Sequence, residues 1–258
     1  MNSITKLSRS AVEQYLKCSR CAWHQYRNKI RFSSFPLTLN LALDILCKND
    51  FDYYRDIQKP HPLFIEKGID AVPYNHPQID NWRNNFKGAY YTNEQEGYKF
   101  GGAVDDIWKH KSGELIISDV KATAKNIFDW EDTYSKYDYA KGYKRQLEMY
   151  QFVFRKLGFD VSNKGYLLYF NGKKNEKSFN NQLNFETHLI ELECSDHWVE
   201  ETIIAAKNCF NSEEIPDSNS DCEMCNYIKK RWSVCQKDVG EFIDKCNQNS
   251  LRKKGWGK

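Results

Sequence analysis

The sequence predicts a mixed α/β fold, and three observations support this prediction. Helical and strand-like segments follow one another in the order helices, strand pair, helix, strand pair, helix. No internal repeat and no low-complexity linker separates them. The 258 residues, of which 40% are hydrophobic and 15% aromatic, are enough to bury one substantial core. Together these features indicate a single mixed α/β domain.

Helices are expected where hydrophobic residues recur at steps of three and four. The clearest case runs from Tyr143 to Leu157, and Gly158 follows it as a stop signal. Ser10 and Glu13 form the pattern of a capping box near the chain start. The expected helices, in chain order, are 10–27, 38–57, 78–90, 141–157 and 196–210.

Strands are expected where polar and apolar residues alternate. The break Lys111-Ser112-Gly113 suits a three-residue hairpin loop, whose last residue is left-handed and favours glycine. A basic turn with Asn171 and Gly172 joins a second strand pair. From about residue 211 the chain is polar, with weak periodicity, and reads as a cysteine-bearing tail. The expected strands are 98–109, 114–121, 160–170 and 183–193.

The first hairpin carries charged residues in an otherwise apolar segment. Counting back from the three-residue loop places Asp105 opposite Asp119. Asp119 and Lys121 are two residues apart and share a face with Asp105, whereas Asp106 points away. Charges in such a place are costly unless they are paired or bind a metal ion.

Two chemical interpretations fit this arrangement. Two close carboxylates repel each other unless a cation lies between them, and Mg²⁺ or Mn²⁺ prefers such oxygen ligands. A lysine beside the ion would orient or deprotonate a water, or stabilise charge on a phosphate, which suits phosphodiester hydrolysis. The alternative is structural: a buried salt bridge between Lys121 and Asp119, with Asp105 in water at a strand end.

The same residues resemble a known signature. Gly102-Ala103-Val104-Asp105 and Ile117-Ser118-Asp119-Val120-Lys121 resemble that of the PD-(D/E)XK nuclease superfamily in its RecB-like form. Gln146 and Tyr150 match the Q-x-x-x-Y helix motif of RecB and AddB nuclease domains and of CRISPR-associated adaptation exonucleases. The resemblance spans roughly residues 7 to 230.

The resemblance implies a restriction-endonuclease-like core, with a central mixed sheet flanked by helices. One nuclease domain would then occupy residues 1–258. Its core would span about 95–195, after a helical extension over 1–94, and a cysteine-bearing tail would follow over 211–258.

The resemblance also implies an active site. Asp105, Asp119 and the backbone carbonyl of Val120 would bind Mg²⁺ or Mn²⁺. Gln146 and Tyr150 would position DNA or support the lysine. Packing alone would also account for Tyr150, which lies on the apolar stripe of its helix. The residues implied to be catalytic are Asp105, Asp119, Lys121, Gln146 and Tyr150.

One position departs from the family pattern. The RecB-like group carries a histidine or an acid on an early helix, and the segment LNLALDILCKNDFD contains no histidine. Asp44 is its nearest candidate. Either Asp44 is an acidic metal ligand or the metal site is incomplete.

Two C-x-x-C pairs, Cys18 with Cys21 and Cys222 with Cys225, lie at opposite ends of the chain. Together they would supply four thiolates for a structural zinc ion or iron–sulfur cluster. Related RecB-like nucleases hold a cluster with one early and three late cysteines, whereas this chain favours a two-plus-two site. The alternative is that all four are free thiols that pack.

The expected partner is DNA, as single strands or ends. The net charge of +3 is only mildly basic, but the clusters 141–145 and 172–177 are suited to a phosphate backbone. The abundant aromatic residues are suited to stacking on unpaired bases. For both features, ordinary solvated surface and ordinary core are the alternatives.

The leading hypothesis is therefore a metal-dependent DNA nuclease of repair, recombination or defence. The alternatives are a catalytically silent DNA-binding or scaffold protein of the same fold and a zinc-stapled interaction module. DNA versus RNA and end-directed versus internal cleavage remain open.

The compartment is expected to be the cytoplasm. The start MNSITKLSRS has no apolar signal segment, no run of about 18 apolar residues predicts a membrane span, and nine cysteines suit a reducing environment. No P-loop motif is present, so a helicase or recombination partner would be a separate chain.

Overall fold

The computed structural model describes residues 4–31 and 37–253. Its strands are β1 (Thr5–Ser8), β2 (Ala71–Pro73), β3 (Ala89–Asn93), β4 (Tyr98–Gly102), β5 (Asp106–His110), β6 (Leu115–Thr123), β7 (Val161–Gly172) and β8 (Phe185–Glu193). Its helices are α1 (Arg9–Lys17), α2 (Ser19–Arg27), α3 (Thr38–Asp56), α4 (Pro62–Lys67), α5 (Ile79–Trp82), α6 (Trp130–Lys136), α7 (Asp138–Lys156), α8 (Val199–Asn211) and α9 (Glu223–Lys253).

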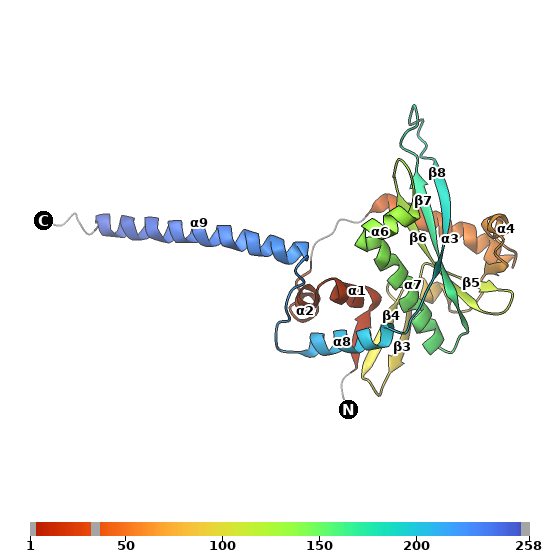
Figure 1. Cartoon of the computed structure of the whole chain (residues 1–258), viewed down its shortest axis with the longest axis horizontal. Coiled ribbons are helices and arrows are strands. Elements are labelled where there is room, and N and C mark those ends of the chain that lie inside the picture. The colour runs from red at the N-terminus through yellow and green to blue at the C-terminus, as the bar shows by residue number, and fades with distance from the viewer. Residues whose placement is uncertain (1–3, 32–36, 254–258) are drawn as a thin grey trace.

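The strands form two sheets (Figure 1). The larger sheet has the order β2-β5-β6-β7-β8, and within it only β6 and β7 pair in parallel. The smaller sheet has the order β1-β4-β3, with β1 parallel to β4. The prediction of a mixed α/β, restriction-endonuclease-like core with a central sheet between helices is confirmed.

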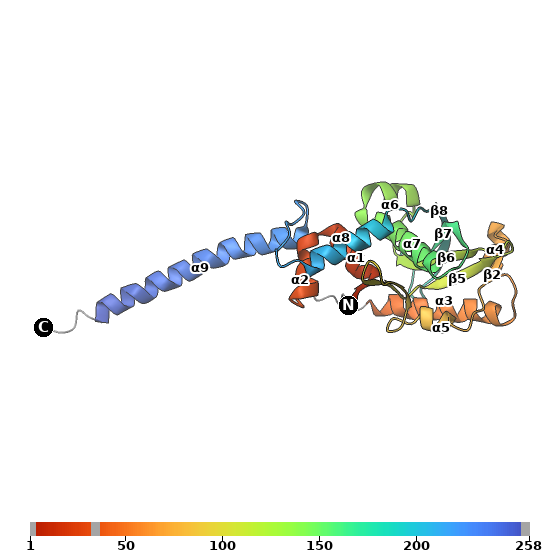
Figure 2. The same cartoon turned by 90° about the horizontal axis from the view of Figure 1, so that it is seen from below.

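Helices cover both faces of the larger sheet, with α7 on one side and α3 on the other (Figure 2). Strand alternation sorts the side chains between these faces. Ile107 and Ile117 join the core beneath α7, whereas Trp108 and Ile116 join the core beneath α3. Successive residues of β5 and β6 therefore face α7 and α3 in alternation.

Helices α1, α2 and α8 pack together beside the smaller sheet, and α9 extends away from the rest of the molecule (Figure 1). Exposed hydrophobic residues on the first turns of α9 include Tyr227, Ile228 and Trp232. No helix in the described part of the chain combines the length and hydropathy needed to cross a membrane.

The expected helix over 10–27 is wrong as a single element. Cys18 adopts an extended backbone (φ −165°, ψ 111°) that ends α1 and begins α2. The N-cap of α1 is Ser8, whose hydroxyl accepts a hydrogen bond from the Ala11 N–H at 3.2 Å, rather than Ser10. With this break, the two early cysteines lie against Cys222 and Cys225 at the start of α9.

Two further element predictions are wrong. The expected helix over 78–90 is only the short α5, and its last residues begin strand β3. The expected strand over 98–109 is two strands, β4 and β5, in different sheets. The chain leaves one sheet and enters the other between Gly102 and Asp106. The residues before 95 therefore contribute β1, β2 and β3 as well as helices.

The end of the chain also differs from expectation. The polar tail after residue 211 contains α9, a helix of 31 residues. Weak hydrophobic periodicity concealed it because its first turns are largely exposed, with no core face to impose a pattern.

Candidate active site and cysteine cluster

The hairpin of β5 and β6 has the register predicted from its loop. Ile107 pairs with Ile117, and Asp106 pairs with Ser118. Gly113 closes the loop with φ +101°, the left-handed conformation that glycine adopts easily. One step further along this register, Asp105 lies opposite Asp119.

Asp105, Asp119 and Lys121 converge at this point. Asp119 is almost fully buried, with 1% of its surface exposed, and its Oδ2 forms an ion pair with Lys121. Asp105 Oδ2 accepts a hydrogen bond from the Val120 N–H at 2.9 Å. Lys121 Nζ also lies 3.3 Å from the Val120 carbonyl. The hairpin therefore gathers two carboxylates, an ammonium and a backbone carbonyl.

The residues of this group shift one another's pKa values. Burial, and after it the nearby Asp119 carboxylate, raises the pKa of Asp105 to about 7. Burial opposes the charged form of Lys121, but Asp119 and Asp105 outweigh burial and raise its pKa above the ordinary value. Lys121 is thus an ammonium, suited to stabilising negative charge. The neighbouring carboxylates of Asp105 and Asp119 are suited to binding a cation.

Helix α7 is hydrogen-bonded to the hairpin and to the segment before it through the two residues of the Q-x-x-x-Y motif. Gln146 Nε2 donates a hydrogen bond to Asp119 Oδ1 at 2.6 Å. The Tyr150 hydroxyl donates to the carbonyl of Ala103, two residues before Asp105. Tyr150 is therefore more than a packing residue, because its hydroxyl ties α7 to the crossing between the sheets.

An open cavity of about 580 Å³ lies beside these residues. Its wall comes from α1, α3, β6 and α7. Asp119 is buried and does not line the cavity, whereas its ion-pair partner Lys121 does. The charged and polar residues along the wall include Arg9, Lys17, Asp44, Asp105, Lys121 and Gln146.

Asp44 lines this cavity but has a partner of its own. Its carboxylate forms an ion pair with Lys48, one turn later on α3, at 2.8 Å. Within residues 4–31 and 37–253, Asp44, Asp105 and Asp119 do not form a cluster tight enough to hold a metal ion by themselves. Their oxygen donors nevertheless suit a hard divalent cation, and burial together with the nearby Asp119 carboxylate raises the pKa of Asp105.

Sequence reasoning missed several residues of the cavity. Arg9 and Lys17 bring positive charge from α1, and Lys121 Nζ lies 4.6 Å from the centre of the Tyr143 ring. Tyr143 was read as core because it shares the apolar stripe of its helix. The three-and-four spacing on α1 predicts that Arg9 and Lys17 share a face, but no sequence signal places that face beside β6.

The basic clusters lie in different settings. Gly172 ends β7, and residues 173–177 are exposed in the turn between β7 and β8 (Figure 1), where none of them lines the cavity. In the cluster 141–145, Arg145 is already paired with Glu13 of α1 at 2.7 Å. Contact of either cluster with DNA remains a prediction.

The four cysteines of the two C-x-x-C pairs converge into one cluster. Their sulfur atoms all lie within 4.8 Å of one another. Cys21 Sγ is 3.6 Å from Cys222 Sγ and 3.5 Å from Cys225 Sγ, and Cys18 Sγ is 3.8 Å from Cys225 Sγ. The cluster joins α2 to the start of α9, and among the described residues it is the one set of such ligands close enough to hold a metal ion.

The local environment favours a thiolate at Cys18 and opposes one at Cys21 and Cys225, whose pKa values are raised by burial and by neighbouring thiols. Burial alone would raise the pKa of Cys18, but the backbone N–H groups of Cys21 and Asn219 and the Cys222 side chain lower it to about 7. Thiolates are the form in which cysteine binds metal ions. The geometry of the four sulfur atoms suits a bound metal.

Comparisons with known proteins identify the family. No curated protein matches the chain significantly. A solved structure described as the crystal structure of SSO0001 is 12% identical, with a TM-score of 0.38, over 83% of this chain and 80% of that one. The family model described as the PD-(D/E)XK nuclease superfamily matches residues 51–236. That match covers most of the chain, including the hairpin and α7, and the protein therefore belongs to the PD-(D/E)XK nuclease superfamily.

Proposed function

We propose that this protein is a Mg²⁺- or Mn²⁺-dependent deoxyribonuclease that acts on single strands or ends of DNA, in repair, recombination or defence. The observation that carries the proposal is the convergence of Asp105, Asp119 and Lys121 beside an open cavity. Nuclease chemistry needs oxygen ligands for a metal and a nearby cation, and this hairpin supplies both.

Each of these residues has a role in the proposal. Asp105, Asp119 and the Val120 carbonyl would hold the metal, and Asp44 would contribute on release from Lys48. When bound, the metal would supply an activated water and neutralise phosphate charge. Lys121, held as an ammonium by its acidic neighbours, would stabilise charge on the cleaved phosphate. Gln146 would orient Asp119, and Tyr150 would fix the segment before Asp105.

The cavity wall supports a nucleic-acid substrate. Arg9, Lys17 and Lys121 bring three cations to it, beside three carboxylates, which are Glu13, Asp44 and Asp105. With a metal ion on the carboxylates, these cations would attract phosphates. Tyr139 and Tyr143 line the same wall, where aromatic faces suit unpaired bases. These features favour a single strand over a fully paired duplex.

A direct test is metal-dependent digestion of labelled oligonucleotides by the wild type and by Asp119→Asn. The proposal predicts that single strands are cut faster than blunt duplexes, that EDTA abolishes cleavage, and that the variant is inactive. Equal cleavage by wild type and Asp119→Asn would show that any activity comes from elsewhere.

A catalytically silent DNA-binding protein of the same fold is the second candidate. Two observations favour it: Asp119 is covered by its ion pair with Lys121, and Asp44 is paired with Lys48. Such a protein would bind DNA without cutting it at any concentration of Mg²⁺ or Mn²⁺. The digestion experiment therefore separates the two candidates.

We further propose that the cysteine cluster holds zinc. A tetrahedral zinc site with Zn–S bonds of about 2.3 Å places its sulfurs about 3.8 Å apart. The three sulfur distances given above, from 3.5 to 3.8 Å, fit this geometry. An iron–sulfur cluster would hold its cysteines farther apart, because iron and sulfide atoms lie between them. Elemental analysis of the purified protein distinguishes zinc from iron.

The wider setting is also a proposal. A single nuclease domain would act in the cytoplasm, with any helicase or recombination partner supplied as a separate chain. Co-purification of the wild type with such a partner on DNA ends would test this.

A further inference from the structure

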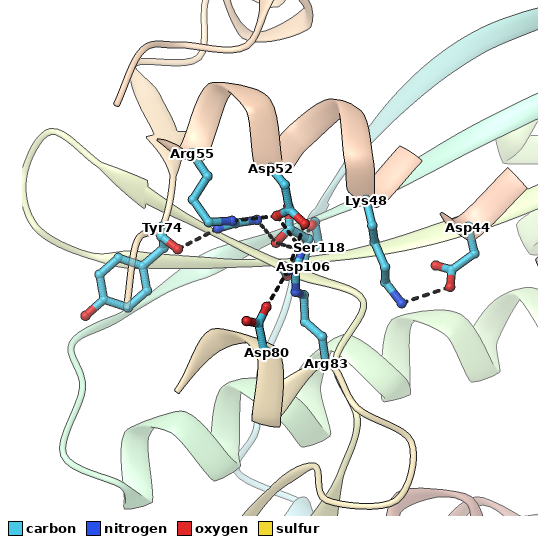
Figure 3. Close-up of polar contacts among 9 residues, drawn as sticks. All are labelled: Asp44, Lys48, Asp52, Arg55, Tyr74, Asp80, Arg83, Asp106 and Ser118. Atoms are coloured by element: carbon cyan, nitrogen blue, oxygen red, sulfur yellow. Dashed lines mark hydrogen bonds and ion pairs between the residues drawn. The ribbon is translucent and has the colours of Figure 1, made fainter. Parts of the chain in front are cut away.

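Asp106, directly after the proposed metal ligand Asp105, is buried on the opposite face of the hairpin (Figure 3). Its Oδ1 accepts a hydrogen bond from Arg55 Nη2 of α3 at 2.5 Å, and Arg83 Nη1 lies 4.0 Å away. The hydroxyl of Ser118, its partner in the strand register, donates to the Asp106 carbonyl at 3.2 Å. Asp106 is thus held through both its side chain and its backbone.

All three nitrogen atoms of the Arg55 guanidinium group donate hydrogen bonds. Besides Asp106, its Nε donates to Asp52 at 2.9 Å and its Nη1 donates to the Tyr74 carbonyl at 2.5 Å. Asp52 also accepts two hydrogen bonds from Arg83, at 2.8 and 3.0 Å. Figure 3 shows Arg55 of α3 and Arg83, directly after α5, converging on Asp106, with the Tyr74 carbonyl beside Arg55. The network joins separate parts of the chain at one residue of β5.

Buried ion pairs of this kind contribute little net stability, because desolvation of both charges offsets their attraction. Their better-supported effect is to fix one arrangement of the surrounding chain. Here the neighbouring chain is the one that presents Asp105. Asp105 itself precedes β5, and the strand pairing begins only at Asp106. The hydrogen bonds between β5 and β6 therefore do not by themselves fix Asp105, which lies one residue outside the paired segment.

We propose that Arg55 and Asp106 are positioning residues for the active site, which hold Asp105 in place as a metal ligand. This inference rests on the proposed function, because it takes Asp105 to be a ligand. Asp105 then lies between two fixed points: the Asp106–Arg55 contact after it and the Tyr150–Ala103 hydrogen bond before it. Residues that orient metal ligands commonly change metal affinity by roughly 10–100-fold when they are replaced.

The test is Mn²⁺ affinity in Arg55→Lys, measured from the loss of the free-ion electron paramagnetic resonance signal. Lysine keeps the positive charge, so long-range attraction or repulsion of the ion is unchanged. A single ammonium cannot make the three contacts of the guanidinium, so the position of Asp106 is released. We expect Mn²⁺ affinity to fall about tenfold while circular dichroism shows a folded protein.

Arg155→Lys is the matched control. Arg155 of α7 also makes several contacts, with the Val161 carbonyl at 2.9 Å, Asn163 at 2.8 Å and Asp196 at 2.8 Å, and none of them lies in the hairpin. The control is expected to lose stability but to keep wild-type Mn²⁺ affinity. If Arg55→Lys does not fold, Arg83→Lys, which loosens the same network, takes its place.

The outcomes separate the inference from the proposed function. Mn²⁺ affinity within twofold of wild type in the Arg55→Lys or Arg83→Lys variant would overturn the positioning role and leave the nuclease proposal standing. A wild type with the same weak Mn²⁺ binding as Asp119→Asn would overturn the metal site itself, and the positioning role with it.

Discussion

Gln146 of α7 donates a hydrogen bond to Asp119 of β6 over 2.6 Å, and both side chains are buried. Sequence motifs place these residues on different elements, 27 positions apart. The contact shows how α7 and the hairpin are assembled into one site. Gln146 contacts Oδ1 of Asp119, and Lys121 forms its ion pair with Oδ2, so each oxygen of this carboxylate has a separate partner.

Replacing Gln146 tests the value of this contact. Gln146→Leu is close in size and removes the donor, so Asp119 loses its fixed orientation. We expect cleavage rate and Mn²⁺ affinity to fall by roughly 10–100-fold.

The control is Gln151→Leu, which removes another buried glutamine of α7 that bonds the Ser162 carbonyl, outside the site. It should lower stability without changing Mn²⁺ affinity. Equal loss of affinity in both variants would mean that Gln146 acts only through the packing of α7.

Asp105→Asn is expected to stabilise the metal-free protein at pH 8. The pKa of Asp105 is about 7 when folded, against about 3.9 for an unfolded aspartate. Because the folded pKa is the higher one, ionisation of Asp105 costs stability progressively as pH rises from about 4 to 7, and fully above 7.

Thermal melting in EDTA checks this sign. The variant should melt a few degrees above wild type at pH 8, since ~1 kcal/mol shifts the melting temperature of a chain this size by roughly 2–4 °C. The difference should shrink toward pH 4. A variant less stable than wild type at pH 8 would show that no electrostatic strain exists at Asp105.

Tyr150→Phe removes the hydroxyl that bonds the Ala103 carbonyl. The buried carbonyl loses its partner, so we expect the free energy of unfolding to fall by about 1 kcal/mol. Urea denaturation measures this loss. Tyr227→Phe, at an exposed position of α9, should be neutral. Unchanged stability in Tyr150→Phe would reduce Tyr150 to a packing residue.

The cysteine cluster predicts one bound zinc per chain. Cys222→Ser should lose the metal and lower the melting temperature, because metal binding is coupled to folding. Cys235→Ser, on the same helix but outside the cluster, should keep both. Iron in the purified wild type, or zinc lost from Cys235→Ser, would contradict the two-plus-two zinc site.

The sequence predicted the fold class and the register of the β5–β6 hairpin, but not the bounds of several helices and strands. The hairpin register followed from one loop and strict strand alternation, both of which are local. Gln146 and Tyr150 could be placed on one helix face because they are four residues apart, but their hydrogen bonds to Asp119 and Ala103 were not predicted. By contrast, β1 pairs with β4 more than 90 residues later, and four residues carry too little pattern to predict it.

Contacts between residues far apart in the sequence could not be predicted either. Nothing local in the sequence indicates that Arg55 and Arg83 gather at one buried carboxylate. The break at Cys18 was hidden by helical periodicity that continues on both sides of it. The C-x-x-C pairs could be matched only because cysteine chemistry offers few other reasons for their spacing.

The most direct test of the proposed nuclease is digestion of labelled single- and double-stranded DNA with Mg²⁺ or Mn²⁺ by the wild type, Lys121→Ala and the surface control Lys164→Ala. We expect cleavage by the wild type and the control, and none by Lys121→Ala, with DNA binding retained in all three. The product ladder would show whether cleavage proceeds from ends. Cleavage that persists in Lys121→Ala, or a wild type that binds DNA without cutting it, would contradict the proposed active site.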